Sequence, residues 1–267
     1  MKFCDMHIHS SFSDGKLNVR EISNLCKEMN LDKFIITDHD TIDAYKQFPE
    51  LLNVSGMEIT CSYEPEIHIL AYGFDINDID INNYCYHFNK NKYLRTLNFF
   101  RKLSADYNIN FLEVFQNKDK INIDEIYDYM VHKGIYKSII DVRNSFITNY
   151  YEYFIKKPLI DAAEAINMIK KASGYTSIAH INRTKLNDFQ QERLILQLKT
   201  AGLDAIEVYN SCYSNIEIKT VLKLSKKYDL KLTGGSDFHG SFKNYHMAKI
   251  PYITEENQIF INRKTYI

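Results

Sequence analysis

The chain has 267 residues, of which 45% are hydrophobic and 25% are charged, a composition typical of a globular domain with one substantial core. No apolar run approaches the roughly 18 to 20 residues that a membrane helix requires, which excludes a transmembrane protein. The 33 basic and 34 acidic residues give a net charge of −1, so the surface offers no overall basic field for long nucleic acid. The first residues lack the apolar segment of a signal peptide, and we therefore expect a cytoplasmic protein.

Short apolar stretches alternate with longer amphipathic ones along most of the chain, as expected for βαβ units. In the first part the pattern predicts strands at 3–9, 33–37, 52–60 and 67–72 and a helix at 19–29. In the last part it predicts strands at 176–180, 205–208 and 231–234 and helices near 188–201 and 214–229. Repeated βα units in one domain of this length favour a parallel barrel over an open sheet.

Between these parts the strand pattern gives way to helical periodicity. It predicts helices at 93–107, 123–133, 137–153 and 161–171, with breaks at Gly134 and Pro158. The prediction is a barrel formed by residues 1–79 and 172–267, with residues 80–171 inserted as a helical subdomain.

His7 and His9, followed by Asp14, are the first candidates for chemistry. On a strand, residues two apart point to the same face, so both imidazoles can reach one cation. With nine histidines in the chain, such a pair is expected by chance about 0.3 times, and the pair alone is weak support for a metal site.

Further charged side chains lie inside apolar strands or at their ends. His39 stands between two aspartates at the end of an apolar strand, and Glu58 lies within one, where an unpaired charge would cost several kcal/mol. His68 and His180 could each be a core histidine when taken singly. Gly234 and Gly235 come shortly before Asp237 and His239, in a turn that permits close backbone approach.

In a parallel barrel the carboxyl ends of the strands converge on one mouth, which is where these side chains would meet. Nine donors are too many for a single ion with four to six ligands, so we expect two or three ions that share a bridging carboxylate, with Glu58 as the bridge. Nitrogen and oxygen donors without cysteine favour manganese, iron or zinc, and clusters of such ions suit in-line displacement at phosphorus. The candidate ligands are His7, His9, Asp14, His39, Glu58, His68, His180, Asp237 and His239.

In order and spacing these motifs resemble the PHP (polymerase and histidinol phosphatase) superfamily, over about residues 2 to 250. The resemblance implies an α/β fold, a distorted (β/α)7 barrel, and a trinuclear metal centre that hydrolyses phosphate esters. It implies a first ion on His7, His9, Glu58 and Asp237, a second on Glu58, His68 and His180, and a third on Asp14, His39 and His239.

The helical insertion resembles that of stand-alone members that act on nucleoside monophosphates, 3′,5′-bisphosphonucleotides or short oligoribonucleotides, and it would cap the site and recognise the substrate. The expected reaction is hydrolysis by a metal-activated hydroxide, with Glu58 and Asp237 in the catalytic centre and His239 as a candidate to assist the leaving oxygen. Arg183 is the candidate clamp for the substrate phosphate, because a guanidinium binds a phosphoryl group in a bidentate way. A histidinol-phosphate or phosphotyrosine-type phosphatase and a non-catalytic PHP module remain alternatives.

Five other residues are candidates for supporting roles. Glu207, Tyr209 and Asn210, at the end of the strand predicted at 205–208, are expected to line the mouth of the barrel. Asp38 and Asp40, which flank His39, are expected to orient imidazole rings by accepting hydrogen bonds from them.

Overall fold

The computed structural model describes residues 3–115, 123–149, 159–240 and 250–251. The chain divides into two compact units, the first made of Met1–Cys85 and Leu159–Ile267 and the second of Tyr86–Pro158. All nine candidate ligands belong to the first unit.

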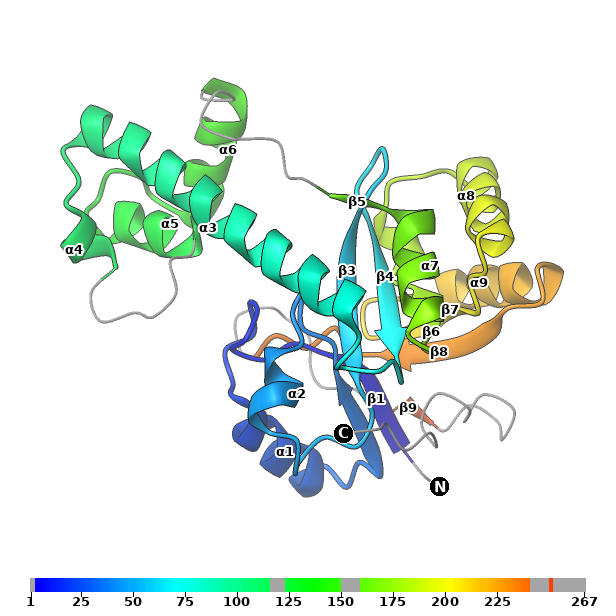
Figure 1. Cartoon of the computed structure of the whole chain (residues 1–267). Coiled ribbons are helices and arrows are strands. Elements are labelled where there is room, and N and C mark those ends of the chain that lie inside the picture. Colours follow the sequence, from blue (N-terminus) through cyan, green and yellow to red (C-terminus); the bar gives the residue numbers. More distant parts are fainter. Residues whose placement is uncertain (1–2, 116–122, 150–158, 241–249, 252–267) are drawn as a thin grey trace. The chain divides into compact units, whose positions relative to one another are not determined.

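The first unit alternates strands with helices (Figure 1). Its strands are β1 (Phe3–Ile8), β2 (Lys33–Ile36), β3 (Gly56–Ser62), β4 (Ile67–Tyr72), β5 (Ile160–Asp161), β6 (Tyr175–Ile178), β7 (Ala205–Asn210), β8 (Lys231–Gly235) and β9 (Ile250–Pro251). Its helices are α1 (Val19–Glu28), α2 (Asp43–Gln47), α7 (Ala162–Lys171), the 3₁₀ helix η2 (Ile181–Arg183), α8 (Asp188–Thr200) and α9 (Asn215–Lys227). Helix α3 (Ile79–Tyr107) begins in this unit and continues into the second.

The strands form one sheet of order β2-β1-β9 and a second of order β5-β3-β4-β6-β7-β8. Pairs β1–β2, β6–β7 and β7–β8 are parallel, whereas β4 runs antiparallel to both β3 and β6. The expectation of an all-parallel arrangement is therefore wrong at β4. Only residues 63–66 join β3 to β4, and a parallel crossover needs a dozen or more.

Two isolated bridges connect the two sheets. Ile8 at the end of β1 pairs with Phe238 beyond β8, and His39 beyond β2 pairs with Glu58 on β3, both in parallel. Backbone hydrogen bonds flank both bridges, for example from the His9 amide to the Phe238 carbonyl at 2.8 Å. Across the described residues these contacts join the sheets without making one continuous closed sheet.

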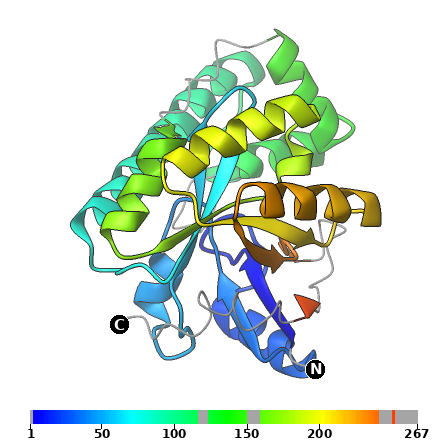
Figure 2. The same ribbon diagram turned by 90° about the vertical axis from the view of Figure 1, so that its right-hand side faces the viewer.

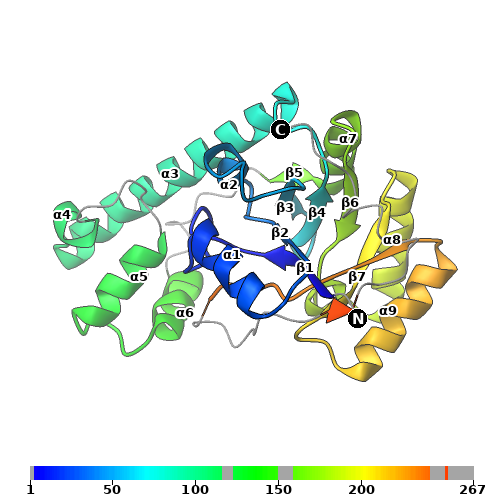
Figure 3. The same cartoon turned by 90° about the horizontal axis from the view of Figure 1, so that it is seen from below.

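Helices cover the outer side of the strands with their apolar faces. Helix α1 lies beside β1 (Figure 3), and a capping box at Asn18 starts it. Its residues Ile22 and Cys26 belong to the main core, as does Ile8 of β1. Helix α7 packs against β3, β4 and β6, α8 contacts α7, and α9 packs against β7 (Figure 2). Helix α7 had been assigned by its sequence to the insertion, but its buried residues, such as Ile166, belong to the main core.

The second unit is helical in its described part. It contains most of α3, together with α4 (Phe111–Val114), α5 (Ile123–His132) and α6 (Ile139–Asn149), and has a small core of its own that includes Phe99, Ile126 and Val142. The last residues of the helix predicted at 137–153 lie outside the described residues. No helix of the described part is both long and apolar enough to cross a bilayer.

Candidate metal centre

Glu58 lies at the centre of the candidate ligands. Its side chain is fully buried on β3, and five imidazole rings place a nitrogen within 3.4 Å of its carboxylate. Oε1 is 2.8 Å from Nδ1 of His68 and 2.9 Å from Nε2 of His180. The other three rings, those of His7, His9 and His39, approach Oε2 at 3.2, 3.1 and 3.4 Å.

His7 and His9 reach this carboxylate because they lie two residues apart at the end of β1 and face the same way. Both rings are fully buried, and their centroids are 5.2 Å apart. Oδ1 of Asp237, from the loop after β8, lies 3.5 Å from Nε2 of His7 and 3.2 Å from Nε2 of His9. Four donors from three segments of the chain therefore surround one point.

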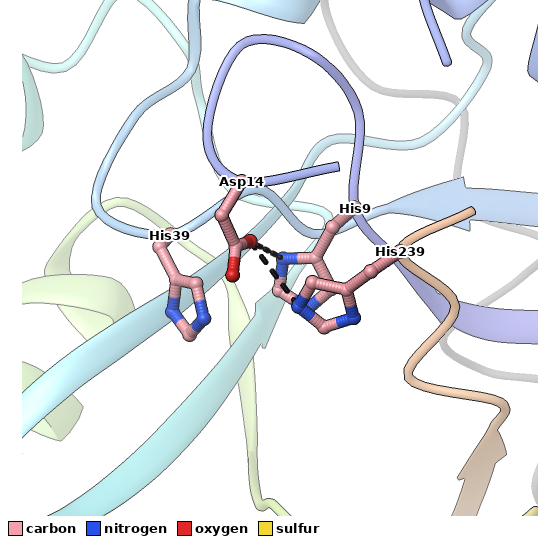
Figure 4. A group of neighbouring side chains, drawn as sticks. All are labelled: His9, Asp14, His39 and His239. Atoms are coloured by element: carbon pink, nitrogen blue, oxygen red, sulfur yellow. Dashed lines mark ion pairs between the residues drawn. The ribbon is translucent and has the colours of Figure 1, made fainter. Parts of the chain in front are cut away.

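A second group forms around Asp14 (Figure 4). Oδ1 of Asp14 is 3.6 Å from Nδ1 of His9 and 3.2 Å from Nε2 of His239, and the two rings stack at 4.0 Å. Figure 4 shows His39 on the other side of the Asp14 carboxylate.

Three sets of donor atoms, each lying within 4.8 Å of one another, could hold an ion. One set equals the ligands that the resemblance implied for the first ion. Another contains the ligands implied for the third ion, Asp14, His39 and His239, together with His9. In the remaining set His39, rather than His180, joins Glu58 and His68, although His180 also contacts Glu58. The sets are His7, His9, Glu58 and Asp237; His9, Asp14, His39 and His239; and His39, Glu58 and His68.

The donors fit a metal better than they fit one another. Nε2 of His7, both ring nitrogens of His9, Nδ1 of His39 and Oε2 of Glu58 are buried without a hydrogen-bonding partner, although each lies close to an oppositely charged or chargeable atom. Burying several such atoms without hydrogen bonds is costly. Bound cations would satisfy lone pairs that converge in this way.

The charges of the site also favour cations. Desolvation disfavours a charged imidazole, but the carboxylates of Asp237 and Glu58 outweigh it and raise the pKa of His9 to about 9. At His68 Glu58 likewise outweighs desolvation and raises the pKa to about 10. Burial would raise the pKa of the Glu58 carboxyl, yet the surrounding rings hold that pKa well below its usual range. In the metal-free protein, protons therefore occupy positions that metal ions would take.

A cavity of about 320 Å³ opens over these donors, a volume that suits a small ligand. Arg183, from η2, lies in its wall and donates from Nη1 to Oδ2 of Asp237 at 2.5 Å. The cavity is lined by His39, Glu58, Glu66, Ile67, His68, His180, Arg183, Thr184, Asp237 and His239.

The hydrogen bonds of the aspartates beside His39 come from backbone and hydroxyl groups. Asp38 accepts hydrogen bonds from the Ser10 amide at 2.7 Å and from the Ser10 and Ser13 hydroxyls at 2.6 Å, and so shapes the loop that carries Asp14. Asp40 accepts from the Thr60 amide at 2.9 Å and from the Tyr84 hydroxyl. The structure thus gives them partners other than the imidazoles expected from the sequence.

Glu207 differs from its expected place as well. It is fully buried behind His7 instead of lining the mouth, and Oε1 lies 2.9 Å from Nδ1 of His7. Glu207 is a charged residue inside the apolar strand predicted at 205–208, and the same feature identified Glu58 as a candidate ligand. The sequence could therefore have indicated a role for Glu207 inside the site.

Comparison with known proteins places the chain in a family. The PHP domain family matches residues 5–201. The chain is 24% identical to the 5'-3' exoribonuclease of Haemophilus influenzae over 259 residues, covering 88% of this chain and 89% of the relative. It is 22% identical to phosphoribosyl 1,2-cyclic phosphate 1,2-diphosphodiesterase of Eggerthella lenta over 272 residues, covering 93% and 97%.

Solved structures agree with the sequence match. A protein from Bifidobacterium adolescentis, described as a metal-dependent phosphoesterase, matches with a TM-score of 0.77 and 27% identity over 92% of this chain and 91% of that one. The family match spans most of the chain and includes seven of the nine candidate ligands, from His7 to His180, and the strands between them. The chain therefore belongs to the PHP domain family.

Proposed function

We propose that this chain is a metal-dependent phosphoesterase that hydrolyses a small phosphate ester, a nucleotide or a short oligoribonucleotide, with two or three divalent ions. The observation that carries the proposal is the fully buried Glu58 carboxylate, around which five imidazole rings converge. Three of these rings, those of His7, His9 and His39, have buried nitrogens without a hydrogen-bonding partner. A buried cluster of this kind has no packing rationale and is expensive to maintain unless cations bind to it.

Two groups of residues would hold the ions most directly. His7, His9, Glu58 and Asp237 would form one site, and Asp14, His39 and His239 would form a second. His68 and His180, which both contact Glu58, would hold a third ion together with it. When bound, such ions neutralise phosphoryl oxygens and lower the pKa of a water molecule, which makes it a nucleophile at neutral pH.

His239 is better suited to hold an ion than to donate a proton to the leaving oxygen. Its Nδ1 lies 2.7 Å from the carbonyl oxygen of Asp237, an acceptor, so this nitrogen carries the proton. The lone pair of Nε2 then faces Asp14, within the second group of donors.

Arg183 is our candidate for binding the substrate phosphate. It lies in the wall of the cavity and donates from Nη1 to Oδ2 of Asp237. A guanidinium matches the geometry of phosphoryl oxygens, so Arg183 would contact both Asp237 and the substrate phosphate.

Two relatives support a ribose phosphate as the substrate class. One is named as an exoribonuclease and the other as acting on a phosphoribosyl cyclic phosphate, and both match the chain over most of its length. We further propose that the insertion predicted at 80–171, without its last helix α7, contributes to substrate recognition, since it lies in the sequence between β4, which carries His68, and β6, which precedes His180.

We infer that the seven strands β1, β2, β3, β4, β6, β7 and β8 form the distorted barrel that the family resemblance implies. The pairing order runs from β2 through β1, across the Ile8–Phe238 bridge to β8, then to β7, β6, β4 and β3, and back through the His39–Glu58 bridge. This ring order supports the inference, and it brings the strand ends with the candidate ligands to one place.

Metal analysis and a substrate screen test the proposed function together. We expect at least two manganese, iron or zinc ions per chain after reconstitution, and faster hydrolysis of AMP, 3′,5′-bisphosphoadenosine or short RNA than of histidinol phosphate or para-nitrophenyl phosphate. Fewer than one ion per chain, with no hydrolysis after manganese reconstitution, would overturn the proposal. Faster hydrolysis of histidinol phosphate would support metal-dependent phosphoester hydrolysis but contradict a nucleotide or oligoribonucleotide substrate.

A further inference from the structure

Glu207 joins two candidate ligands from different strands. Its Oε1 contacts Nδ1 of His7 at 2.9 Å, and its Oε2 accepts from the His180 amide at 2.8 Å and from Nδ2 of Asn210 at 3.1 Å. The carboxylate is fully buried on β7 and lies outside all three sets of donor atoms that could hold an ion.

We propose that Glu207 is a positioning residue that sets the tautomer of His7 and the backbone of His180, so that both rings present a lone pair to the metal centre. This inference rests on the proposed function of the site. Glu207 does not touch the reacting atoms, and it acts only through the two histidines.

The tautomer follows from the chemistry of the carboxylate. An ionised carboxylate only accepts hydrogen bonds, so Nδ1 of His7 carries the proton and donates it to Glu207. The opposite nitrogen, Nε2, then has its lone pair directed at the group that contains Glu58 and Asp237, which lie 3.2 and 3.5 Å away. Buried partners of this kind orient metal-binding histidines in other proteins.

The second effect is on the backbone at the end of β6. His180 has a φ of 23° and a ψ of 50°, a conformation that a residue with a side chain seldom adopts. The bond from its amide to Oε2 of Glu207 stabilises this conformation, and from there the ring reaches Glu58 with Nε2 at 2.9 Å. One carboxylate therefore holds two ligands that are 173 positions apart in the sequence, since 180 − 7 = 173.

Glu207→Gln separates the two effects with little change in shape. An amide has one acceptor and one donor, and the Oε2 side faces two donors, the His180 amide and the Asn210 side chain. The glutamine oxygen should therefore take that side, and its NH₂ group should face His7. Nδ1 of His7 must then accept, which moves the proton to Nε2 and removes the lone pair from the metal group.

The test uses zinc alone as the probe, with zinc affinity and the NMR spectrum of ¹⁵N-histidine-labelled protein as readouts. In the wild-type protein we expect His7 to carry its proton on Nδ1 and to bind zinc through Nε2. In Glu207→Gln we expect zinc affinity to fall about 10- to 100-fold, the usual loss for such partners. Thr233→Val is the matched control, since it removes a buried 2.7 Å hydrogen bond between Thr233 on β8 and Ser177 on β6 and should bind zinc like the wild type.

Unchanged zinc affinity in Glu207→Gln, or zinc on Nδ1 of His7 in the wild type, would overturn the inference. Failure of the wild-type protein to bind any metal would overturn the proposed function instead. The proposed effect of Glu207 on the His180 backbone can still be tested in the metal-free protein, by amide hydrogen exchange. Glu207→Ala should speed exchange of the His180 amide at least tenfold relative to the Ala179 amide, which donates to His68, and an unchanged ratio would contradict it.

Discussion

Gly235 lies so close to His7 that no side chain fits between them. A Cβ atom at position 235 would stand 2.1 Å from Cβ of His7 and 2.5 Å from its amide nitrogen. The contact joins the end of β8 to β1 at one of the candidate metal ligands, and the atoms that a side chain would meet are the backbone and Cβ of His7.

Gly235→Ala should therefore lower the free energy of unfolding by about 1 to 3 kcal/mol or more, because overpacking forces the backbone apart. It should also weaken metal binding, since His7 must move. Denaturant unfolding and zinc titration measure the two effects. Gly134→Ala, where a Cβ would meet nothing within 4 Å but φ is 72°, should cost less and leave zinc binding unchanged. Equal effects of the two variants would contradict the prediction.

Glu58→Gln should abolish most of the turnover by removing the charge that the ions share. The loss should exceed the roughly 100-fold that partners behind the ligands typically cost. The fold should persist, because glutamine has nearly the same shape, and circular dichroism checks this. Glu164→Gln, on the exposed surface of α7, is the control. Turnover of Glu58→Gln within tenfold of the control would show that the site is misassigned.

Replacing Arg183 should act mainly on substrate binding. Arg183→Gln is expected to raise KM about tenfold or more, since hydrogen bonds to charged groups contribute about 1.5 to 3 kcal/mol. Arg183→Lys keeps the positive charge but cannot bind a phosphate in a bidentate way, so it should retain only part of the affinity for the substrate. Steady-state kinetics with a good substrate gives KM and kcat separately. A fall in kcat and in bound metal at unchanged KM would instead assign Arg183 to the support of Asp237.

Metal affinity should rise with pH. His9 and His68 have pKa values raised to about 9 and about 10 in the metal-free protein, so at neutral pH an ion must displace their protons. Zinc affinity should therefore increase between pH 6.5 and pH 8.5, by up to about tenfold per pH unit for each proton released. Calorimetry in buffers of different ionisation enthalpy counts those protons. Affinity that does not change over this range would contradict the assigned protonation.

The stability of the metal-free protein should change in the opposite direction. A pKa raised above the value in the unfolded chain, about 6.5 for histidine, means that the folded state binds more protons between that pH and pH 9 to 10. The stabilisation is complete below about pH 6.5 and is lost as the pH rises through 9 and 10. Chemical unfolding of protein stripped by EDTA at pH 6.5 and pH 9.5 measures it, and greater stability at the higher pH would contradict the prediction.

Local pattern was sufficient to predict most of the elements near the site. The strand at 67–72 has the bounds predicted from its alternating and apolar residues, and the helix at 188–201 ends one residue earlier than predicted. The predicted strand at 52–60 begins later, at Gly56, and extends to Ser62. Helix α7 was recognised as a helix but assigned to the wrong part of the chain, because its amphipathic face does not reveal which core it joins.

The sequence by itself determined which donors exist and which neighbours along the chain can act together. His7 and His9 share a face because side chains alternate along a strand, and this requires no knowledge of the rest of the fold. The same holds for the two glycines that end β8, Gly234 and Gly235, since a residue without a side chain permits the close approach seen between Gly235 and His7.

Only the tertiary structure decided which atoms meet. The antiparallel pairing of β4 places His68 opposite Thr60, beside Glu58, and the burial of β7 places Glu207 behind His7. Such contacts join residues far apart in the sequence, and they depend on strand order, direction and register, which local periodicity does not contain. The donor types and the choice of Glu58 as the bridging carboxylate thus follow from the sequence, whereas the arrangement of five rings around Glu58 and the support from Glu207 are properties of the fold.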